Sequence, residues 1–300
     1  MRIPFFCSIF AANLKAMTND QWQISNIQSQ LESAYPKDEA KALAWWIVEE
    51  ETGLSRSQIL SGCKITKNFA HVQEVIDRLL HFEPIQYIFG HTEWRGLDLK
   101  VTPATLIPRP ETAELVEKIT NYQLPITNCR VLDVGTGSGC IAIALKKAHP
   151  EWQVTGIDIS SEAIEVAREN AKRNGVEVTF HVADIFSDSI EKNHHLPFTI
   201  HQYDLVVSNP PYICEHEKEG MRPNVLDFEP HTALFVPDAD PLKFYRRIAE
   251  LKLGKYLFFE INEAYPAEVS AMLADLGYTD ILITKDIYGK ARIIEGRMVG

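Results

Sequence analysis

The segment 209–212, Asn-Pro-Pro-Tyr, carries the groups best suited to hold a reacting molecule in this chain of 300 residues. Its two prolines fix φ at successive positions and donate no N–H, and Asn209, which precedes a proline, is disfavoured in the helical region. The segment is therefore a stiff corner that offers a side-chain amide, a backbone carbonyl and an aromatic ring. These groups suit a planar guest that donates N–H bonds, although a strand that merely ends in a Pro-Pro turn would look the same.

A glycine-rich segment, 131–140, could hold a second ligand. An apolar run, three alternating glycines and a helix start follow one another, and such a turn lets the backbone approach a ligand closely. The spacing fails the dinucleotide fingerprint, whose third glycine would fall at Cys140. It suits S-adenosylmethionine, which has no phosphate and whose ammonium Asp133 can receive directly or through water. The other expected contacts come from Gly135, Thr136, Gly137, Ser138 and Gly139.

Two further acids lie at the carboxyl ends of the next two predicted strands. Asp158 can accept both ribose hydroxyls, as an acid does in dinucleotide folds. Asp184 can accept the adenine amino group, and Phe186 can stack on or flank the purine. Open α/β sheets bind ligands at the carboxyl ends of their strands, and with Asp133 three consecutive strands place an acid there. We therefore predict a site for S-adenosyl-L-methionine, with S-adenosyl-L-homocysteine as the product.

The elements that must position these residues alternate between strand and helix from Cys129 onward. Such alternation gives a parallel sheet with helices on both faces, and the short turn between the last two strands makes them antiparallel. The predicted fold is α/β, a Rossmann-like seven-stranded sheet with an antiparallel C-terminal hairpin, characteristic of S-adenosylmethionine-dependent methyltransferases. The strands are predicted at 129–134, 154–158, 177–182, 203–208, 256–261, 281–285 and 292–295, and the helices at 139–148, 161–174, 241–251 and 266–276.

Four segments are expected along the chain. They are a leader at 1–17, expected to be disordered, a small N-terminal helical bundle at 18–81, a connector with a β-hairpin at 82–105 and a methyltransferase domain at 106–300. The leader resembles a short signal sequence, but Pro4 interrupts its apolar run. Trp45 and Trp46 are expected in the core of the helical bundle. Arg109 and Glu111 fit either a surface turn with a first-turn helix acid or a lip over an active site.

The position of Asn-Pro-Pro-Tyr after the fourth strand resembles methyltransferases that act on planar nitrogens. Such a nitrogen is a poor nucleophile because its lone pair is delocalised. The Asn209 side-chain oxygen and the Pro210 carbonyl can accept its two N–H bonds, hold the lone pair toward the methyl group and stabilise the charge that grows on nitrogen. Pro211 stiffens the corner, and Tyr212 can pack on the planar group. Transfer would be a direct in-line displacement without a covalent intermediate or a metal.

Two upstream segments, Pro-Ile-Gln-Tyr-Ile-Phe-Gly at 84–90 and Leu-Ile-Pro-Arg-Pro-Glu-Thr at 106–112, complete a resemblance to one family. The chain resembles the peptide chain release factor glutamine N5-methyltransferases (PrmC/HemK) over roughly 20–300. That family methylates the glutamine of a Gly-Gly-Gln motif in class I release factors. The resemblance implies that the target amide is held by Asn209, Pro210 and Tyr212, with Pro211, Arg109 and Glu111 as further substrate-binding candidates. It also implies cofactor contacts from Gly135 to Gly139, Asp158, Phe186 and Asn209.

Three alternatives stay open. A ribosomal-protein glutamine methyltransferase shares Asn-Pro-Pro-Tyr and the two-domain plan. A DNA or RNA adenine N6-methyltransferase uses the same acceptor geometry, but the net charge of −11 and the lack of a basic recognition domain oppose it. A cofactor-binding protein that is not an enzyme is opposed by the intact Asn209 beside a complete set of acids.

The composition bounds the remaining possibilities. The chain is 45% hydrophobic and 24% charged, as in ordinary globular proteins. Its five scattered cysteines argue against a disulfide framework and a zinc site, and His194, His195 and His201 are expected as solvated loop residues. No stretch reaches the ~18 apolar residues of a membrane span. We therefore expect a cytoplasmic monomer that binds release factors, with no metal and no direct contact to nucleic acid or membranes.

Overall fold

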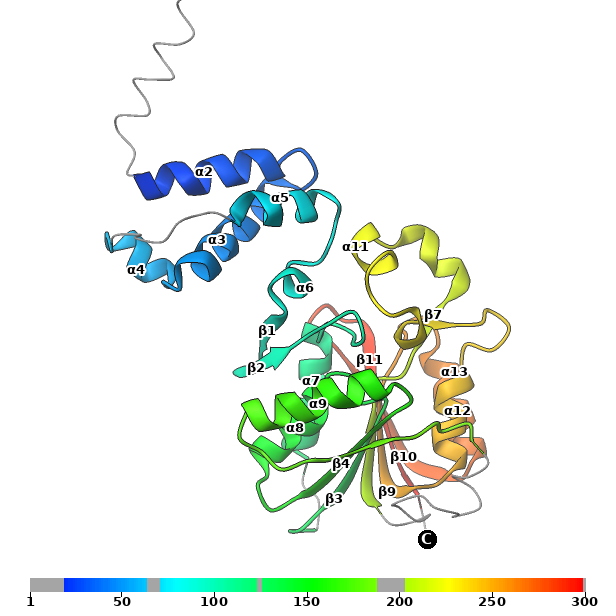
Figure 1. Ribbon diagram of the computed structural model, residues 1–300. Coiled ribbons are helices and arrows are strands. Elements are labelled where there is room, and N and C mark those ends of the chain that lie inside the picture. Colours follow the sequence, from blue (N-terminus) through cyan, green and yellow to red (C-terminus); the bar gives the residue numbers. More distant parts are fainter. Residues whose placement is uncertain (1–18, 64–70, 123–125, 188–202, 299–300) are drawn as a thin grey trace, which may run out of the picture. The chain divides into compact units, whose positions relative to one another are not determined.

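The structure, a computed structural model, describes residues 19–63, 71–122, 126–187 and 203–298. The chain divides into two compact units, with the boundary in the sequence between Phe89 and Gly90 (Figure 1). The expected leader at 1–17 lies outside the described residues, and so do His194, His195 and His201. No helix in the described part of the chain is long and apolar enough to cross a membrane.

The first unit is helical, as its periodicity predicts. Gly53, in the left-handed region at φ 68°, ends the helix α3. Ser55 forms a capping box with Gln58 at the start of the next helix, α4. Trp45 and Trp46 are only partly buried against the core, so their placement within it is wrong. Leucine, isoleucine, valine and alanine side chains fill that core instead. The helices are α2 (Asn19–Leu31), α3 (Lys37–Thr52), α4 (Arg56–Leu60), α5 (Val72–Leu80) and α6 (Ile85–Phe89).

The two tryptophans lie at the edge of the core because each contacts a charged residue near the surface. The Arg56 guanidinium lies 4.5 Å from the Trp45 ring centroid, and Trp46 Nε1 donates a hydrogen bond to Glu50 Oε1. Indole rings commonly bury an apolar body while their N–H keeps a polar partner. The spacing of apolar residues along a helix could not predict that the two tryptophans are partly rather than fully buried.

The second unit begins with the predicted hairpin, β1 (His91–Trp94) paired antiparallel with β2 (Leu97–Lys100). Leu97 and Leu99 are buried on either side of the exposed Asp98, as in a strand with one buried face. The preceding 85–89, expected as part of the connector, forms the short helix α6 of the first unit.

The main sheet of the second unit has seven strands in the order β10-β11-β9-β6-β3-β4-β5, which confirms the predicted fold (Figure 1). The strands from β5 across to β9 are parallel, and β11 is antiparallel to both of its neighbours. The hairpin strands are longer than predicted. The bounds are β3 (Arg130–Val134), β4 (Gln153–Asp158), β5 (Thr179–Val182), β6 (Tyr203–Ser208), β9 (Gly254–Glu260), β10 (Tyr278–Lys285) and β11 (Ala291–Met298).

Helices cover both faces of this sheet because successive strand residues point to opposite sides. Val131 points to one face and packs in the hydrophobic core there, whereas its neighbour Leu132 points to the other face and packs in a second core. On the first face lie α7 (Pro110–Thr120), α8 (Cys140–Ala148) and α9 (Ser161–Arg173), and on the second lie α12 (Lys243–Glu250) and α13 (Pro266–Asp275).

The strand order reverses direction at β3, which lies between β4 and β6. Chain segments that leave β3 and β6 therefore run to opposite sides, and such a switch point opens a crevice at the carboxyl ends of the strands. A segment missed by the sequence patterns follows β6. It contains the short parallel pair β7 (Ile213–Cys214) and β8 (Phe235–Val236), with η1 (Glu215–Gly220), α11 (Pro223–Leu226) and η2 (His231–Ala233) between them.

Candidate active site

A cavity of about 560 Å³ opens in the second unit where β3, β4, β5 and β6 end. That volume lies within the range of small-molecule sites. Among the residues predicted for the site, eleven line it. They are Arg109, Gly135, Thr136, Gly137, Ser138, Asp158, Asp184, Phe186, Asn209, Pro210 and Pro211. Four others, Glu111, Asp133, Gly139 and Tyr212, do not line it, so their predicted contacts stay predictions.

The glycine-rich loop after β3 exposes backbone to the cavity. Gly135 and Gly137 have φ values of 71° and 53°, a region that favours glycine. A Cβ at either position would have no heavy atom within 4 Å, so each borders open space that a ligand can enter. Gly139 acts differently, because a Cβ there would lie 3.1 Å from Ala167 Cβ on α9. Because glycine has no Cβ, the start of α8 can approach α9 closely at this point.

Asp133 lies beneath this loop rather than on the cavity wall. Its carboxyl is fully buried, and Thr136 Oγ1 donates a hydrogen bond to Asp133 Oδ2 over 2.6 Å. Burial raises the pKa of Asp133 to about 7, although the Thr136 hydrogen bond favours the charged form. Because Thr136 itself lines the cavity, the acid supports the loop from below and is linked to the cavity wall through Thr136.

Asp158 ends β4 and lines the cavity, as predicted from its position. Its Oδ2 accepts the Gly137 N–H over 2.9 Å, and its Oδ1 accepts the Ser160 N–H over 3.0 Å. Burial raises the pKa of this carboxyl. A carboxylate has about four acceptor positions, so Asp158 can tie the glycine loop to β4 and still accept hydroxyl groups from a ligand.

Asp184 and Phe186 form the cavity wall that follows β5. Asp184 Oδ1 accepts the Phe186 N–H over 2.9 Å. This bond closes a tight turn that fixes the backbone from which the Phe186 ring extends. The Phe186 ring is 37% exposed, and the Lys243 ammonium lies 4.9 Å from its centroid. Ile159, next to Asp158, also lines the cavity and is 63% exposed. An exposed isoleucine and an exposed phenyl ring suit the faces of a planar heterocycle, and the sequence patterns missed Ile159.

Asn209 is tied to two residues that the strand patterns did not single out. Its Nδ2 donates to Thr112 Oγ1 over 3.0 Å, and Thr112 Oγ1 donates to Glu260 Oε2 over 2.6 Å. The Tyr212 hydroxyl donates to the other oxygen, Glu260 Oε1, over 3.0 Å. Burial raises the pKa of Glu260, while the bonds from Thr112 and Tyr212 favour its charged form. Burial and the Glu260 carboxylate raise the pKa of Tyr212 well above its ordinary value.

Arg109 lines the cavity and forms an ion pair with a buried carboxylate. Its Nη2 lies 2.5 Å from Oε1 of Glu229, whose side chain is fully buried. Glu229 Oε2 also accepts the Ile107 N–H over 3.2 Å. The pair fixes the segment that leads into α7 and thereby positions Thr112. Arg109 lines the cavity and Glu111 does not, and the lip over an active site stays a prediction for both.

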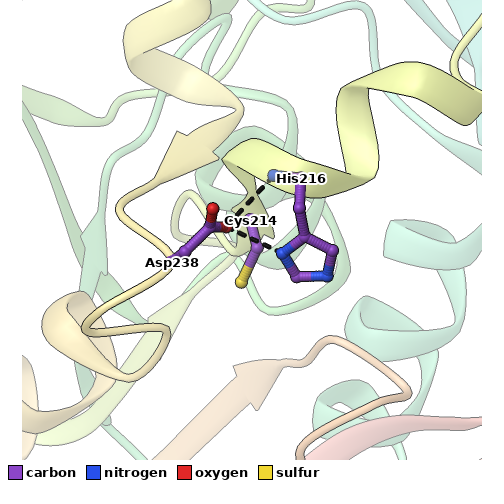
Figure 2. A group of neighbouring side chains, drawn as sticks. All are labelled: Cys214, His216 and Asp238. Carbon is purple, nitrogen blue, oxygen red and sulfur yellow. Dashed lines mark hydrogen bonds and ion pairs between the residues drawn. The ribbon is translucent and has the colours of Figure 1, made fainter.

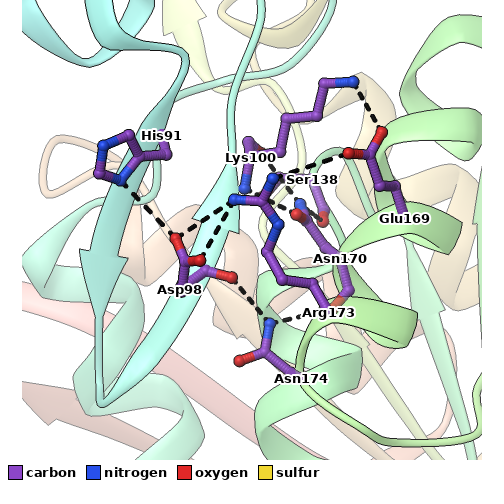
Figure 3. Close-up of polar contacts among 8 residues, drawn as sticks. All are labelled: His91, Asp98, Lys100, Ser138, Glu169, Asn170, Arg173 and Asn174. Carbon is purple, nitrogen blue, oxygen red and sulfur yellow. Dashed lines mark hydrogen bonds and ion pairs between the residues drawn. The ribbon is translucent and has the colours of Figure 1, made fainter.

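A buried asparagine joins the glycine loop to the hairpin (Figure 3). Asn170 on α9 is fully buried, and its Nδ2 donates to the carbonyls of Ser138 and Lys100, each over 2.9 Å. Its Oδ1 accepts the Lys100 N–H over 2.7 Å. Two ion pairs flank it nearer the surface, Lys100 with Glu169 and Arg173 with Asp98. The hairpin is therefore attached to the glycine-rich loop through one amide side chain.

The structure also brings together Cys214, His216 and Asp238, which the spacing of the cysteines did not suggest (Figure 2). Their possible ligand atoms lie within 4.8 Å of one another. His216 Nδ1 lies 2.7 Å from Asp238 Oδ1, which is a hydrogen-bond distance, and Cys214 Sγ lies 3.6 Å from the Tyr265 hydroxyl. Burial raises the pKa of the Cys214 thiol, which disfavours the thiolate that metals require. The three side chains thus satisfy one another or their neighbours without an ion.

Each of the two units matches a family of known proteins. A family model described as a methyltransferase domain matches residues 126–270, and one described as the PrmC N-terminal domain matches residues 24–90. A release factor glutamine methyltransferase of Bacteroides thetaiotaomicron is 45% identical over 281 residues, which cover 89% of this chain and 96% of that protein. One of Flavobacterium psychrophilum is 44% identical over 232 residues, which cover 74% of this chain and 78% of that protein.

Solved structures support the fold alone. The catalytic domain of hMettl16, in complex with hairpin 1 of the MAT2A 3′UTR, superimposes with a TM-score of 0.53 at 15% identity and covers 91% of each chain. At that identity the likeness concerns the arrangement of strands and helices. The residues that line the cavity must therefore be interpreted from their own chemistry and from the sequence relatives.

Proposed function

The chain belongs to the release factor glutamine methyltransferase family, and from that premise we propose that it methylates the side-chain amide nitrogen, N5, of a glutamine in class I peptide chain release factors. The glutamine is that of their Gly-Gly-Gln motif, and the methyl group comes from S-adenosyl-L-methionine. The observation that supports this activity best is the position of Asn209 on the wall of the cavity that the glycine loop and Asp158 also line. One amide acceptor thus borders the space in which the methyl donor would lie.

The residues of the cavity fit the cofactor. The open backbone at Gly135 and Gly137 can approach its amino-acid end, and the buried Asp133 beneath them can balance its ammonium. Asp158 can accept the ribose hydroxyls. Asp184 can accept the adenine amino group while the purine lies beside Phe186. S-adenosylmethionine would supply a methyl group on a positively charged sulfur and leave as the neutral thioether S-adenosyl-L-homocysteine.

The reacting amide would be held by the corner that follows β6. Asn209 Oδ1 and the Pro210 carbonyl accept the two N–H bonds of the target glutamine, which turns the face of its nitrogen toward the methyl group. The same two acceptors stabilise the positive charge that grows on that nitrogen. The target nitrogen would take the methyl group as the bond from that methyl group to sulfur breaks, and it would then lose one proton to water. No metal takes part in these steps.

The corner is held rigidly enough for this purpose. Asn262 Nδ2 donates to the Tyr212 carbonyl over 3.0 Å, and Glu260 holds the Tyr212 hydroxyl. Orientation within a fraction of an ångström is what converts binding into rate acceleration. The Tyr212 ring packs against the core beneath α12 and α13, so its contact with the substrate amide stays a prediction.

Release factors as partners imply a cytoplasmic enzyme. We propose that it acts as a monomer and recognises its substrate through protein contacts, without direct nucleic-acid or membrane binding. The net charge of −11 supports this, because an acidic protein is repelled by a phosphate backbone.

The test is transfer of a labelled methyl group from S-adenosylmethionine to purified class I release factors. Label is expected on one glutamine and should disappear when that glutamine of the release factor is replaced by alanine. Asn209→Ala should lower turnover by about 100- to 1,000-fold, the range for loss of one preorganised donor or acceptor, and leave the cofactor Kd within a few-fold. Label found only in a ribosomal protein, or in nucleic acid, would contradict the proposed substrate.

A further inference from the structure

Glu260 contacts the site only through other residues. It lies at the carboxyl end of β9, is 1% exposed and is absent from the cavity lining, yet both of its oxygens accept hydrogen bonds from residues of the site. We propose that Glu260, acting through the Thr112 hydroxyl, decides which way the Asn209 amide faces. This proposal rests on the proposed function, since it concerns the acceptor that holds the substrate glutamine.

The direction of the Asn209 amide follows from a count of hydrogens. A threonine hydroxyl has one hydrogen and two acceptor positions, and a carboxylate is acceptor-only. The Thr112 hydrogen must therefore point at Glu260, and the 2.6 Å separation is typical of such a charge-assisted bond. Thr112 Oγ1 then presents only lone pairs to Asn209, so the amide must turn its NH₂ group to it, as observed over 3.0 Å. Asn209 Oδ1 is left as the acceptor for the substrate.

Shape alone could not make this choice. The oxygen and nitrogen ends of an asparagine amide are nearly the same size, so only hydrogen bonding distinguishes them. If the Thr112 hydroxyl were free to rotate, it could donate to Asn209 Oδ1, and the reversed amide would point its NH₂ group at the NH₂ group of the substrate. Two donors would then face each other and the substrate amide would lose an acceptor.

Tyr212 strengthens the same arrangement. Its hydroxyl donates to Glu260 Oε1 over 3.0 Å, and a carboxylate is the one side chain that accepts at both oxygens. A glutamine at 260 would offer NH₂ on one side, so either Thr112 or Tyr212 would lose its acceptor. One buried carboxylate thus orients both ends of the Asn-Pro-Pro-Tyr corner, and Thr112 and Glu260 are positioning residues for the reaction.

The first experiment reads the amide directly. The side-chain ¹⁵N–¹H₂ signals of Asn209 are assigned by their loss in Asn209→Ala and are recorded without substrate. Thr112→Val keeps the shape of the side chain and removes the hydroxyl, and it should shift or broaden these signals. Thr112→Ser keeps the hydroxyl and should restore them. Thr120→Val is the matched control on the same helix, because among the described residues Thr120 Oγ1 donates its hydrogen bond to the Val116 carbonyl of α7 and not to a residue of the site.

The second experiment measures methyl transfer to a release factor. Thr112→Val and Glu260→Gln should each lower kcat at least 10-fold with a cofactor Kd within threefold of wild type. The double variant should be little worse than Glu260→Gln alone, since Thr112 acts on Asn209 only through the hydrogen bond that Glu260 accepts from it. Thr112→Ser should keep at least a third of the wild-type kcat, and Thr120→Val should equal wild type.

The outcomes separate this inference from the proposed function. If wild type transfers no methyl group to release factors but the Asn209 signals respond as described, the substrate proposal fails and the orienting role of Glu260 stands. Unchanged Asn209 signals in Thr112→Val and Glu260→Gln would overturn the orienting role, and so would full kcat in folded Thr112→Val. Additive losses in the double variant would also overturn it, because they would mean that the two residues act separately.

Discussion

Binding of S-adenosylmethionine is expected to release a proton from Asp133. The Asp133 carboxyl is fully buried, and burial raises its pKa to about 7, so at pH 6 about nine in ten molecules carry a proton there. If this acid balances the ammonium of the cofactor, directly or through water, the nearby positive charge favours the carboxylate and lowers the pKa. The proton must then leave as the cofactor binds.

The size of the release follows from the same pKa. If binding lowers the Asp133 pKa from about 7 far enough that the bound carboxyl is fully charged, about 0.9 proton is released at pH 6 and about 0.5 proton at pH 7. The α-amino group of the cofactor contributes little at pH 6, because such groups have a pKa near 8 and are already protonated. The measurement is isothermal titration calorimetry at pH 6 in two buffers that differ in ionisation enthalpy.

Asp133→Asn is the control, since an amide has no proton to release. The variant should bind S-adenosylmethionine more weakly and release almost no proton. Release below about 0.2 proton in wild type, or equal release in the variant, would refute the idea that Asp133 balances the ammonium.

The same carboxyl sets a pH dependence of stability in the cofactor-free protein. Because the folded-state pKa of Asp133 is raised, its contribution to stability is fully present below about pH 4 and is lost as the pH rises to about 7. The difference between about 7 and the ordinary 3.8 corresponds to about 4 kcal/mol. Asp133→Asn should therefore gain up to about that much relative to wild type between pH 4 and pH 7 in urea unfolding, and parallel curves would contradict the raised pKa.

Two further predictions concern the supports of the site. Asn170→Ala leaves the Ser138 carbonyl and both backbone groups of Lys100 without the partner they have now, so urea unfolding should show a loss of about 3–6 kcal/mol and calorimetry a weaker cofactor affinity. Asn174→Ala, which removes only more exposed bonds, should lose less, and an equal loss would contradict a special role for the buried amide. Glu229→Ala removes the carboxylate that pairs with the partly exposed Arg109 and accepts the Ile107 N–H, so it should destabilise by about 1–3 kcal/mol and lower turnover with the release factor; unchanged turnover in the folded variant would show that the lip does not position α7.

The hydrophobic patterns predicted the fold well because they are local. Each parallel strand reads as an apolar run followed by turn residues and a helical period, so the alternation and the antiparallel end could be derived without coordinates. Boundaries were less accurate at β10, which begins at Tyr278 rather than Ile281, because its outer face is exposed and its apolar pattern is weak. The segment 213–236 was missed because its two paired strands have two residues each.

The acids proposed for the cofactor site were singled out by one rule, that an acid at the carboxyl end of a strand borders the ligand crevice. The same rule would have found Glu260, which ends the apolar strand β9, had it been extended to the fifth strand. It could not have shown that Asp133 lies beneath the glycine loop while Asp158 lines the cavity. That difference depends on how the strands and the loop pack.

The sequence by itself determined the order of elements, the carboxylates at the strand ends and the corner Asn-Pro-Pro-Tyr, because apolar period and backbone restriction act over a few residues. Only the tertiary structure decided how that corner is held. Thr112 and Glu260 are 148 positions apart, and Thr112 and Asn209 are 97 apart. No local pattern joins such residues, since their contact requires α7, β6 and β9 to be packed together. The sequence alone thus identifies Asn209 as a candidate site residue, whereas the direction of its side-chain amide follows from hydrogen bonds that exist only in the folded protein.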